Sequence, residues 1–215
     1  MRNPDQWTDE NIERSKSEVL ELFNLTKKQL EELKSKIERF DGLIRIFIHP
    51  NANDNGRKIE NQDRVYQIMS RTILSNEAPP IIIMENERDV WLWSQSIKET
   101  NPNNIYLVPT MLNYPYPVIP GEPRLSKKDE DRILEEKDQP QIEANFKKFI
   151  TILEDLGVKK IFVGGTSLVI IDDITGCVGN FINHMRVFSK FEIKLSLGTA
   201  PLNRTDISEI DTDLL

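Results

Sequence analysis

One cysteine is the residue of this sequence best suited to nucleophilic chemistry. Cys177 lies in the run Thr175-Gly176-Cys177-Val178-Gly179, directly before a segment with helical periodicity. In the first turn of a helix, unpaired amides and the helix dipole stabilise a thiolate and lower the pKa of the thiol. Cysteines outside disulfides are also among the most buried residue types. The sequence therefore predicts either a nucleophile or a thiol packed in the core.

His49 is the second candidate for catalysis, and it follows the apolar run Leu43–Ile48. An imidazole at the end of a strand can act as an acid, a base or a ligand. Asn51, Asn53 and Asp54 come soon after it, and their oxygens suit orienting the ring, binding a ligand or holding a hard cation. The alternative is that these residues only form the loop between a strand and a helix.

A glycine-rich run follows another apolar segment, at Gly164-Gly165-Thr166-Ser167. Backbone amides in such turns can approach an anion closely. The run lacks both the Gly-x-Gly-x-x-Gly pattern and the Gly-Lys-Ser/Thr of nucleotide-binding loops, so it does not predict a nucleotide. The alternative is a tight turn that needs a positive φ.

Short apolar runs that alternate with helical segments position these candidates. This alternation is typical of parallel βαβ units. It predicts a three-layer α/β fold with a mostly parallel, doubly wound, Rossmann-like sheet of about five strands. We expect strands over residues 43–48, 81–84, 105–108, 160–163 and 192–197. We expect helices over residues 57–75, around 90–97, from about 146 to a C-cap near Gly157, and over 178–188.

Ligands of open parallel sheets bind outside the carboxyl ends of the strands, near the point where the strand order reverses. The residues that follow each predicted strand should therefore meet at one edge. This adds Glu85, after the second strand, and Thr110, after the third, to the ligand-binding candidates. The sequence predicts a small polar ligand at this edge, and no motif identifies a cofactor.

We divide the chain into an N-terminal helical extension (1–41), an α/β domain (42–202) and an acidic C-terminal tail (203–215). Within the domain, residues 111–140 contain five prolines and many charges, which is typical of a lid or a binding loop. Two helices are expected within residues 8–40. Their apolar stripe either forms a dimerisation or partner-binding hairpin or packs on the chain's own sheet.

Composition excludes several classes of protein. The 28 Lys and Arg against 35 Asp and Glu give a net charge of −7, so phosphate backbones repel the chain and we expect no nucleic-acid binding. No apolar run is long enough to cross a bilayer, and the first residues lack the apolar stretch of a signal peptide. A single cysteine excludes a disulfide scaffold and predicts a cytoplasmic location. Two histidines and one cysteine predict no metal site.

The run from Leu153 to Gly165, LEDLGVKKIFVGG, followed by Gly176-Cys177-Val178, resembles the isochorismatase-like cysteine hydrolases. In that family, a strand ending in glycine leads to a Cys-Val at a helix N-terminus within an α/β sheet. The resemblance covers about residues 146–198 and implies amide hydrolysis by Cys177, helped by an aspartate and a lysine. Of the catalytic residues that the resemblance implies, only the cysteine has a counterpart in this chain. Ile48-His49 stands where the family has aspartate, and no lysine of this chain matches the family's lysine.

Two functions follow from these observations. The first is a small-molecule hydrolase with its site at the carboxyl ends of the strands, acting through Cys177. The second is a non-catalytic module that binds a ligand, or a protein partner through residues 8–40, for example in a homo-oligomer. A nucleophile without an identified base favours the second function, whereas polar residues at every strand end favour the first.

Overall fold

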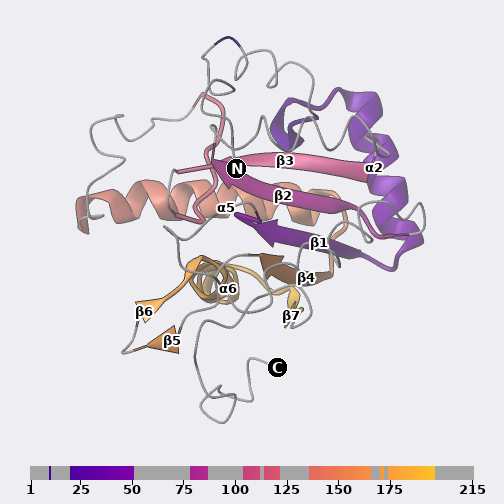
Figure 1. The fold of residues 1–215 in the computed structure, drawn as a ribbon. Helices are drawn as coiled ribbons and strands as arrows, with labels where there is room; N and C mark the ends of the chain where they lie inside the picture. The colour runs from indigo at the N-terminus through magenta and orange to yellow at the C-terminus, as the bar shows by residue number, and fades with distance from the viewer. Residues whose placement is uncertain are drawn as a thin grey trace.

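The computed structural model describes residue 10 and residues 20–50, 78–86, 104–111, 114–121, 136–165, 170–171 and 174–196. Its centre is a five-stranded sheet in which every described pair of neighbouring strands is parallel, as predicted (Figure 1). The strands, in their spatial order, are β3 (Ile105–Thr110), β2 (Ile81–Asn86), β1 (Leu43–Ile48), β4 (Lys160–Gly165) and β7 (Glu192–Leu195). The fold is thus α/β and Rossmann-like.

Helices α5 (Gln139–Asp155) and α6 (Cys177–Phe188) cover one face of the sheet, which we call the α5/α6 face (Figure 1). The side chains of Ile44, Ile46 and Ile48 join the hydrophobic core on this face. Because successive strand residues point to opposite sides, Arg45 and Phe47 of β1 lie on the opposite face. β2 and β3 are buried along nearly their whole length, as a parallel sheet requires.

Three strands are longer than the sequence predicted from its apolar runs. Pairing continues to Asn86↔Thr110 between β2 and β3 and to Ile48↔Gly165 between β1 and β4. Glu85, Thr110, Gly164 and Gly165 therefore belong to the last residues of strands rather than to the loops after them. Ladder hydrogen bonds, which do not depend on side-chain polarity, explain the extension. β7, by contrast, ends two residues before the predicted limit.

The described part of the N-terminal segment packs on the chain's own sheet. Leu22, in the short 3-10 helix η2 (Leu22–Asn24), and Leu33 and Ile37 of α2 (Lys27–Arg39) are buried in the main core. The amide of Leu107 in β3 also donates to the carbonyl of Leu20 at 2.9 Å. These contacts support the second interpretation of this segment. Partner binding through residues 8–40 stays a prediction.

A capping box begins α2. The Thr26 hydroxyl accepts from the Gln29 amide, and the Gln29 side chain accepts from the Thr26 amide at 2.9 Å. Each side chain satisfies a backbone donor that the first turn of a helix leaves open. The predicted stop near Gly157 is also confirmed, because α5 ends at Asp155 and Gly157 has a φ of +82°.

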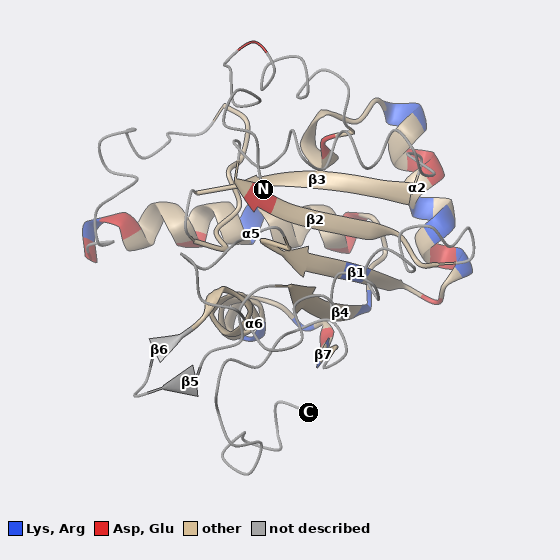
Figure 2. Cartoon of the chain, viewed as in Figure 1, with Lys and Arg blue, Asp and Glu red and all other residues tan. Residues whose placement is uncertain are grey.

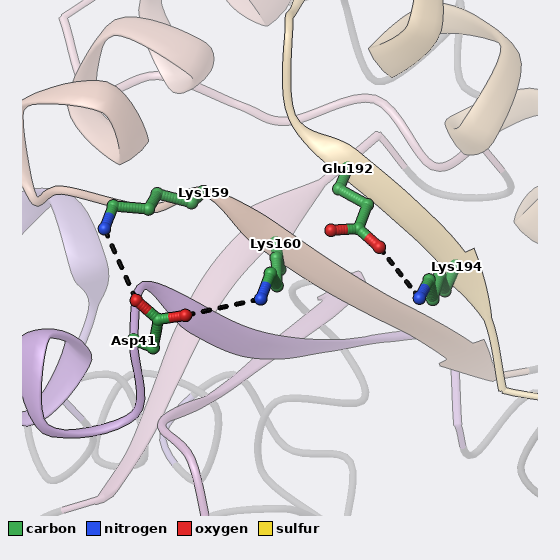
Figure 3. A network of polar contacts seen from close by, with 5 residues as sticks. All are labelled: Asp41, Lys159, Lys160, Glu192 and Lys194. Carbon is green, nitrogen blue, oxygen red and sulfur yellow. Dashed lines mark hydrogen bonds and ion pairs between the residues drawn. The ribbon is translucent and has the colours of Figure 1, made fainter.

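A polar network at the amino ends of β1 and β4 joins the two central strands (Figure 3). The Asp41 carboxylate pairs with Lys159 at 3.5 Å and Lys160 at 3.3 Å, and beside it Glu192 pairs with Lys194 at 2.8 Å. The hydrogen bond from Lys160 is the main cause of a lowered pKa of Asp41. Because these side chains are exposed, the pairs contribute little to stability and weaken in salt. These surface ion pairs connect neighbouring strands at the amino edge of the sheet.

Charged residues lie mainly on the helices and at the ends of the sheet (Figure 2). The only charged residues in β1, β2 and β3 are Arg45 and Glu85. Within the described ranges, no helix is both long and apolar enough to span a membrane.

Several predicted segments lie outside the described residues. They are residues 1–9 and 11–19 of the N-terminal segment, the helices over 57–75 and 90–97, residues 112–113 and 122–135 of the proline-rich excursion, and the tail 203–215. A small antiparallel hairpin of β5 (Ile170–Ile171) and β6 (Ile174–Thr175) precedes α6. The short helix η4 (Glu136–Asp138) leads into α5.

Candidate functional site

The strand order reverses between β1 and β4. The chain passes from β1 to β2 and β3 on one side, and β4 and β7 follow on the other side of β1. At such a reversal the connections leave the sheet in different directions, which opens a crevice at the carboxyl edge. His49 follows β1 there, and Gly165 is the last residue of β4. The sheet therefore places two predicted site residues on neighbouring strands at this seam.

His49, which follows β1, is hydrogen-bonded to β2 through its backbone and to β3 through its side chain. Its amide donates to the carbonyl of Met84 in β2 at 2.8 Å, and its Nε2 lies 2.9 Å from Oγ1 of Thr110 in β3. The residue is only 3% exposed. Its φ of +41° is uncommon for a residue with a side chain, so the backbone here carries strain. Strained, over-determined residues of this kind cluster at functional sites.

Burial sets the protonation state of this imidazole. It lowers the pKa of His49 from 6.5 to about 4. The ring is therefore neutral at pH 7, with one nitrogen that donates and one that accepts. A neutral imidazole can orient a ligand or accept a proton, but it does not supply a positive charge.

Gly165 brings β4 against β1 more closely than any side chain allows. Its φ is +121°, and a Cβ built on it would overlap the Ile48 carbonyl, lying 2.8 Å from the carbonyl carbon. The seam between the two strands is therefore formed by bare backbone at its carboxyl end. The positive φ that the turn alternative requires is present, but Gly165 is the last residue of a strand and does not lie in a turn.

Glu85 completes the set of buried polar residues at this edge. Its side chain is 0% exposed, and its Oε1 accepts a hydrogen bond from the Asn86 amide at 3.0 Å. The register places it next to Pro109 on β3. The strand register brings His49, Glu85, Thr110, Gly164 and Gly165 to the carboxyl edge, but strand alternation puts Thr110 on the α5/α6 face and Glu85 on the opposite face. A side-chain hydrogen bond joins His49 to Thr110.

The remaining ligand-binding candidates cannot be placed. Asn51, Asn53, Asp54, Thr166 and Ser167 lie outside the described residues. Their roles stay predictions.

Cys177 is the first residue of α6, as the sequence suggested. Gly176 is the N-cap and has no side chain to satisfy the first amides, and the first helical bond runs from Asn180 to the Gly176 carbonyl at 2.9 Å. The thiol is half-buried and packs against the core. The location combines features of both interpretations: the helix terminus of a nucleophile and the apolar surroundings of a core cysteine.

An aromatic cluster beside Cys177 was not predicted. Tyr116 stacks on Tyr114 at 5.6 Å, and its ring lies 5.2 Å from that of His184. Burial, Tyr114 and Cys177, in that order, raise the pKa of the Tyr116 hydroxyl. The buried Asn145 of α5 holds this segment by donating to the Pro117 carbonyl at 2.9 Å. The repeated Tyr-Pro of residues 114–117 is the available signal, whereas the proline density of the segment predicts only a lid or a binding loop.

No protein-family model, curated protein or solved structure matches this chain. The chemistry of the site must therefore be argued from its own residues. Over the ranges that the structure describes, no three His, Cys, Asp or Glu side chains form a group that could hold a metal ion. What the carboxyl edge offers is a neutral imidazole, a buried hydroxyl and a buried carboxyl beside the backbone of two glycines. Such groups hold a polar ligand by hydrogen bonds.

Proposed function

We propose that this protein binds a small polar molecule at the carboxyl edge of its sheet, beside the reversal of strand order at β1. The observation that carries the proposal is the buried pair of His49 and Thr110 at the reversal of strand order. A stable core does not need a strained histidine whose burial makes its charged form unfavourable. A ligand site benefits from such a residue, because ligand binding requires polar groups in fixed orientations within an apolar wall.

Removing the Thr110 hydroxyl should weaken ligand binding. Thr110→Val keeps the shape of the side chain but leaves the buried Nε2 of His49 without this partner. We expect a loss of about 1–3 kcal/mol in the free energy of unfolding. Small polar fragments that bind the wild type, found by ligand-observed NMR, should bind the variant at least about tenfold more weakly, which corresponds to 1.4 kcal/mol.

Thr151→Val is the matched control for this variant. The Thr151 hydroxyl donates to the Lys147 carbonyl at 2.9 Å on the exposed side of α5. This control should bind the same fragments with wild-type affinity. Equal fragment binding by Thr110→Val and the wild type, or a wild type that binds no fragment, would refute the proposal.

Hydrolysis through Cys177 is the second candidate function, and the position of the thiol at the start of α6 favours it. In this reaction the thiolate attacks an amide carbonyl, the C–N bond breaks as the amine leaves with a proton, and water then hydrolyses the thioester. The resemblance to the isochorismatase-like hydrolases points to the same chemistry. A cytoplasmic location belongs to this proposal, because the thiol must stay reduced.

The rate of alkylation distinguishes a nucleophile from a core cysteine. If Cys177 is a nucleophile, iodoacetamide should label the native protein at pH 7 faster than it labels glutathione, because part of the thiol is then thiolate. Cys177→Ala should keep the stability of the wild type. Slow native labelling that becomes rapid only in urea, with Cys177→Ser destabilised by about 1–3 kcal/mol, would instead establish a core residue.

A further inference from the structure

The two outer strands of the sheet differ in how the described chain covers them. At the outer side of β3, the amide of Leu107 donates to the Leu20 carbonyl at 2.9 Å, and the amide of Val118 donates to the Pro109 carbonyl at 2.8 Å. The chain's own segments therefore occupy backbone groups of that strand. β7 is the outer strand on the other side, and the described residues place no strand beyond it (Figure 1). An edge strand of this kind is a template for pairing with another chain.

The ladder with β4 leaves every second residue of β7 facing outward. The amide of Glu192 donates to the Lys159 carbonyl at 2.9 Å, and the amide of Ser196 donates to the Val163 carbonyl at 2.8 Å. Because backbone groups alternate in direction along a strand, the N–H and C=O groups of residues 193 and 195 point away from β4. These are the groups that a further strand would bond.

The side chains of β7 alternate between apolar and charged. Ile193 and Leu195 pack against the core on the α5/α6 face, as does Phe191 just before the strand. Glu192 and Lys194 lie on the opposite face and are joined by an ion pair of 2.8 Å, with 47% and 54% of their side chains exposed (Figure 3). From residue 191 to residue 195 the order is thus apolar, acidic, apolar, basic, apolar. This order is symmetric about Ile193, except that the two charges are opposite.

A second copy of this strand, running antiparallel, matches that order residue by residue. With a two-fold axis at Ile193, the outward N–H and C=O of this residue bond the same groups of the second copy. Glu192 then lies directly opposite Lys194 of the second copy in a non-hydrogen-bonded pair, the closer of the two kinds, and the axis repeats the contact. Opposite charges in such pairs are favourable, and like charges are unfavourable.

We propose that β7 is a homodimer interface, at which two copies of this chain pair their β7 strands antiparallel about Ile193 into one continuous sheet. A parallel copy in register would set Glu192 against Glu192 and Lys194 against Lys194, so the charges select the antiparallel arrangement. Assembly stops at two copies, because each chain has one β7 and the two-fold axis uses both. The dimer is expected to be weak, because a strand of four residues buries less than the about 1,200 Å² of stable complexes.

Charge reversal tests the interface in the full chain. Sedimentation equilibrium over about 10 µM to 1 mM gives the Kd of the dimer. Lys194→Glu sets acid against acid at both symmetric contacts, and Glu192→Lys sets base against base. Each should weaken dimerisation at least about tenfold. The double variant Glu192→Lys/Lys194→Glu restores opposite charges across the axis and should regain most of the wild-type affinity. Lys34→Glu, on the exposed side of α2, is the control with the same change of net charge as Lys194→Glu and should dimerise like the wild type.

Ile193→Pro tests the backbone part of the interface. Proline lacks an N–H, but the N–H of this residue points outward and does not serve the ladder with β4, and proline is tolerated at such positions of edge strands. The variant should keep the circular dichroism of the wild type and dimerise at least about tenfold more weakly. Hydrogen exchange of the wild type reports the same groups without a substitution. The amides of Ile193 and Leu195 should exchange more slowly as the concentration rises from about 10 µM to 1 mM, whereas that of Ser196 should not change.

Several results would overturn the inference. One is a wild type that stays monomeric up to about 1 mM, and another is assembly beyond two copies. A dimer that both single charge reversals leave unchanged, or whose Ile193 amide exchanges at the same rate at all concentrations, would mean that the copies meet elsewhere, for example through residues 8–40. None of these results bears on the proposed ligand site, because that site contains no residue of β7.

Discussion

Gly165→Ala is expected to destabilise the protein by more than about 3 kcal/mol, or to prevent folding. A φ of +121° is strained for any residue with a side chain, at a cost of about 1–3 kcal/mol. The added Cβ would also overlap the backbone of Ile48, which lies in the centre of the sheet and cannot move without breaking its pairing. Overpacking of this kind costs about a further 1–3 kcal/mol. Unfolding in urea, followed by circular dichroism, measures the difference.

Gly157→Ala is the control that measures the cost of a positive φ without steric overlap of the added Cβ. Gly157 also has a positive φ, +82°, but nothing lies within 4 Å of the Cβ that alanine would add. Its cost should be only that of the left-handed backbone, about 1–2 kcal/mol. Equal costs at the two positions would mean that β1 and β4 do not approach each other as closely as the seam requires.

Lowering the pH from 7 to 4 should reduce the free energy of unfolding by about 3 kcal/mol through His49 alone. The pKa of His49 is about 4 in the folded protein and 6.5 without burial. As the pH falls, the unfolded chain therefore binds a proton before the folded protein does, and stability falls. The stabilisation that depends on a neutral His49 is complete above pH 6.5, declines between pH 6.5 and about 4, and is absent below that range.

His49→Asn is the control for this pH dependence. Asparagine tolerates the left-handed backbone and does not titrate, so the variant isolates the imidazole. The slope of unfolding free energy against pH between 6.5 and 4 should be smaller in the variant by one proton. Identical slopes in the two proteins would show that His49 is solvated, which would remove the basis for a fixed polar site.

The strands and their parallel arrangement were predictable because buried parallel strands are short apolar runs separated by helical segments. The capping box of Thr26 and Gln29 and the stop at Gly157 were predictable because they depend on neighbours in sequence. The carboxyl edge could be located for the same reason, because polar or small residues follow each strand in the sequence. Local patterns thus gave the elements and the edge on which a site should lie.

Contacts between distant segments could not be predicted. The bond of His49 with Thr110 depends on β2 lying between their strands, and the sequence does not state the strand order. Tyr116 meets His184 only because residues 114–117 fold back onto α5 and α6. Arg45 was hidden within an apolar run, where a single charge does not disturb the periodicity. Its position between Ile81 and Phe162 becomes visible only when the neighbouring strands are in place.

The most direct test of the account is a map of backbone-amide NMR shifts in the presence of small polar fragments, carboxylates and amides included. The account predicts that the largest shifts gather at residues 48–50, 84–86, 109–111 and 164–165, which the sheet brings to its carboxyl edge. Amides at the opposite end of the same strands, such as those of Gly42, Lys159 and Lys160, should not respond. Shifts centred on that amino edge, or on α2, would contradict the assignment of the site.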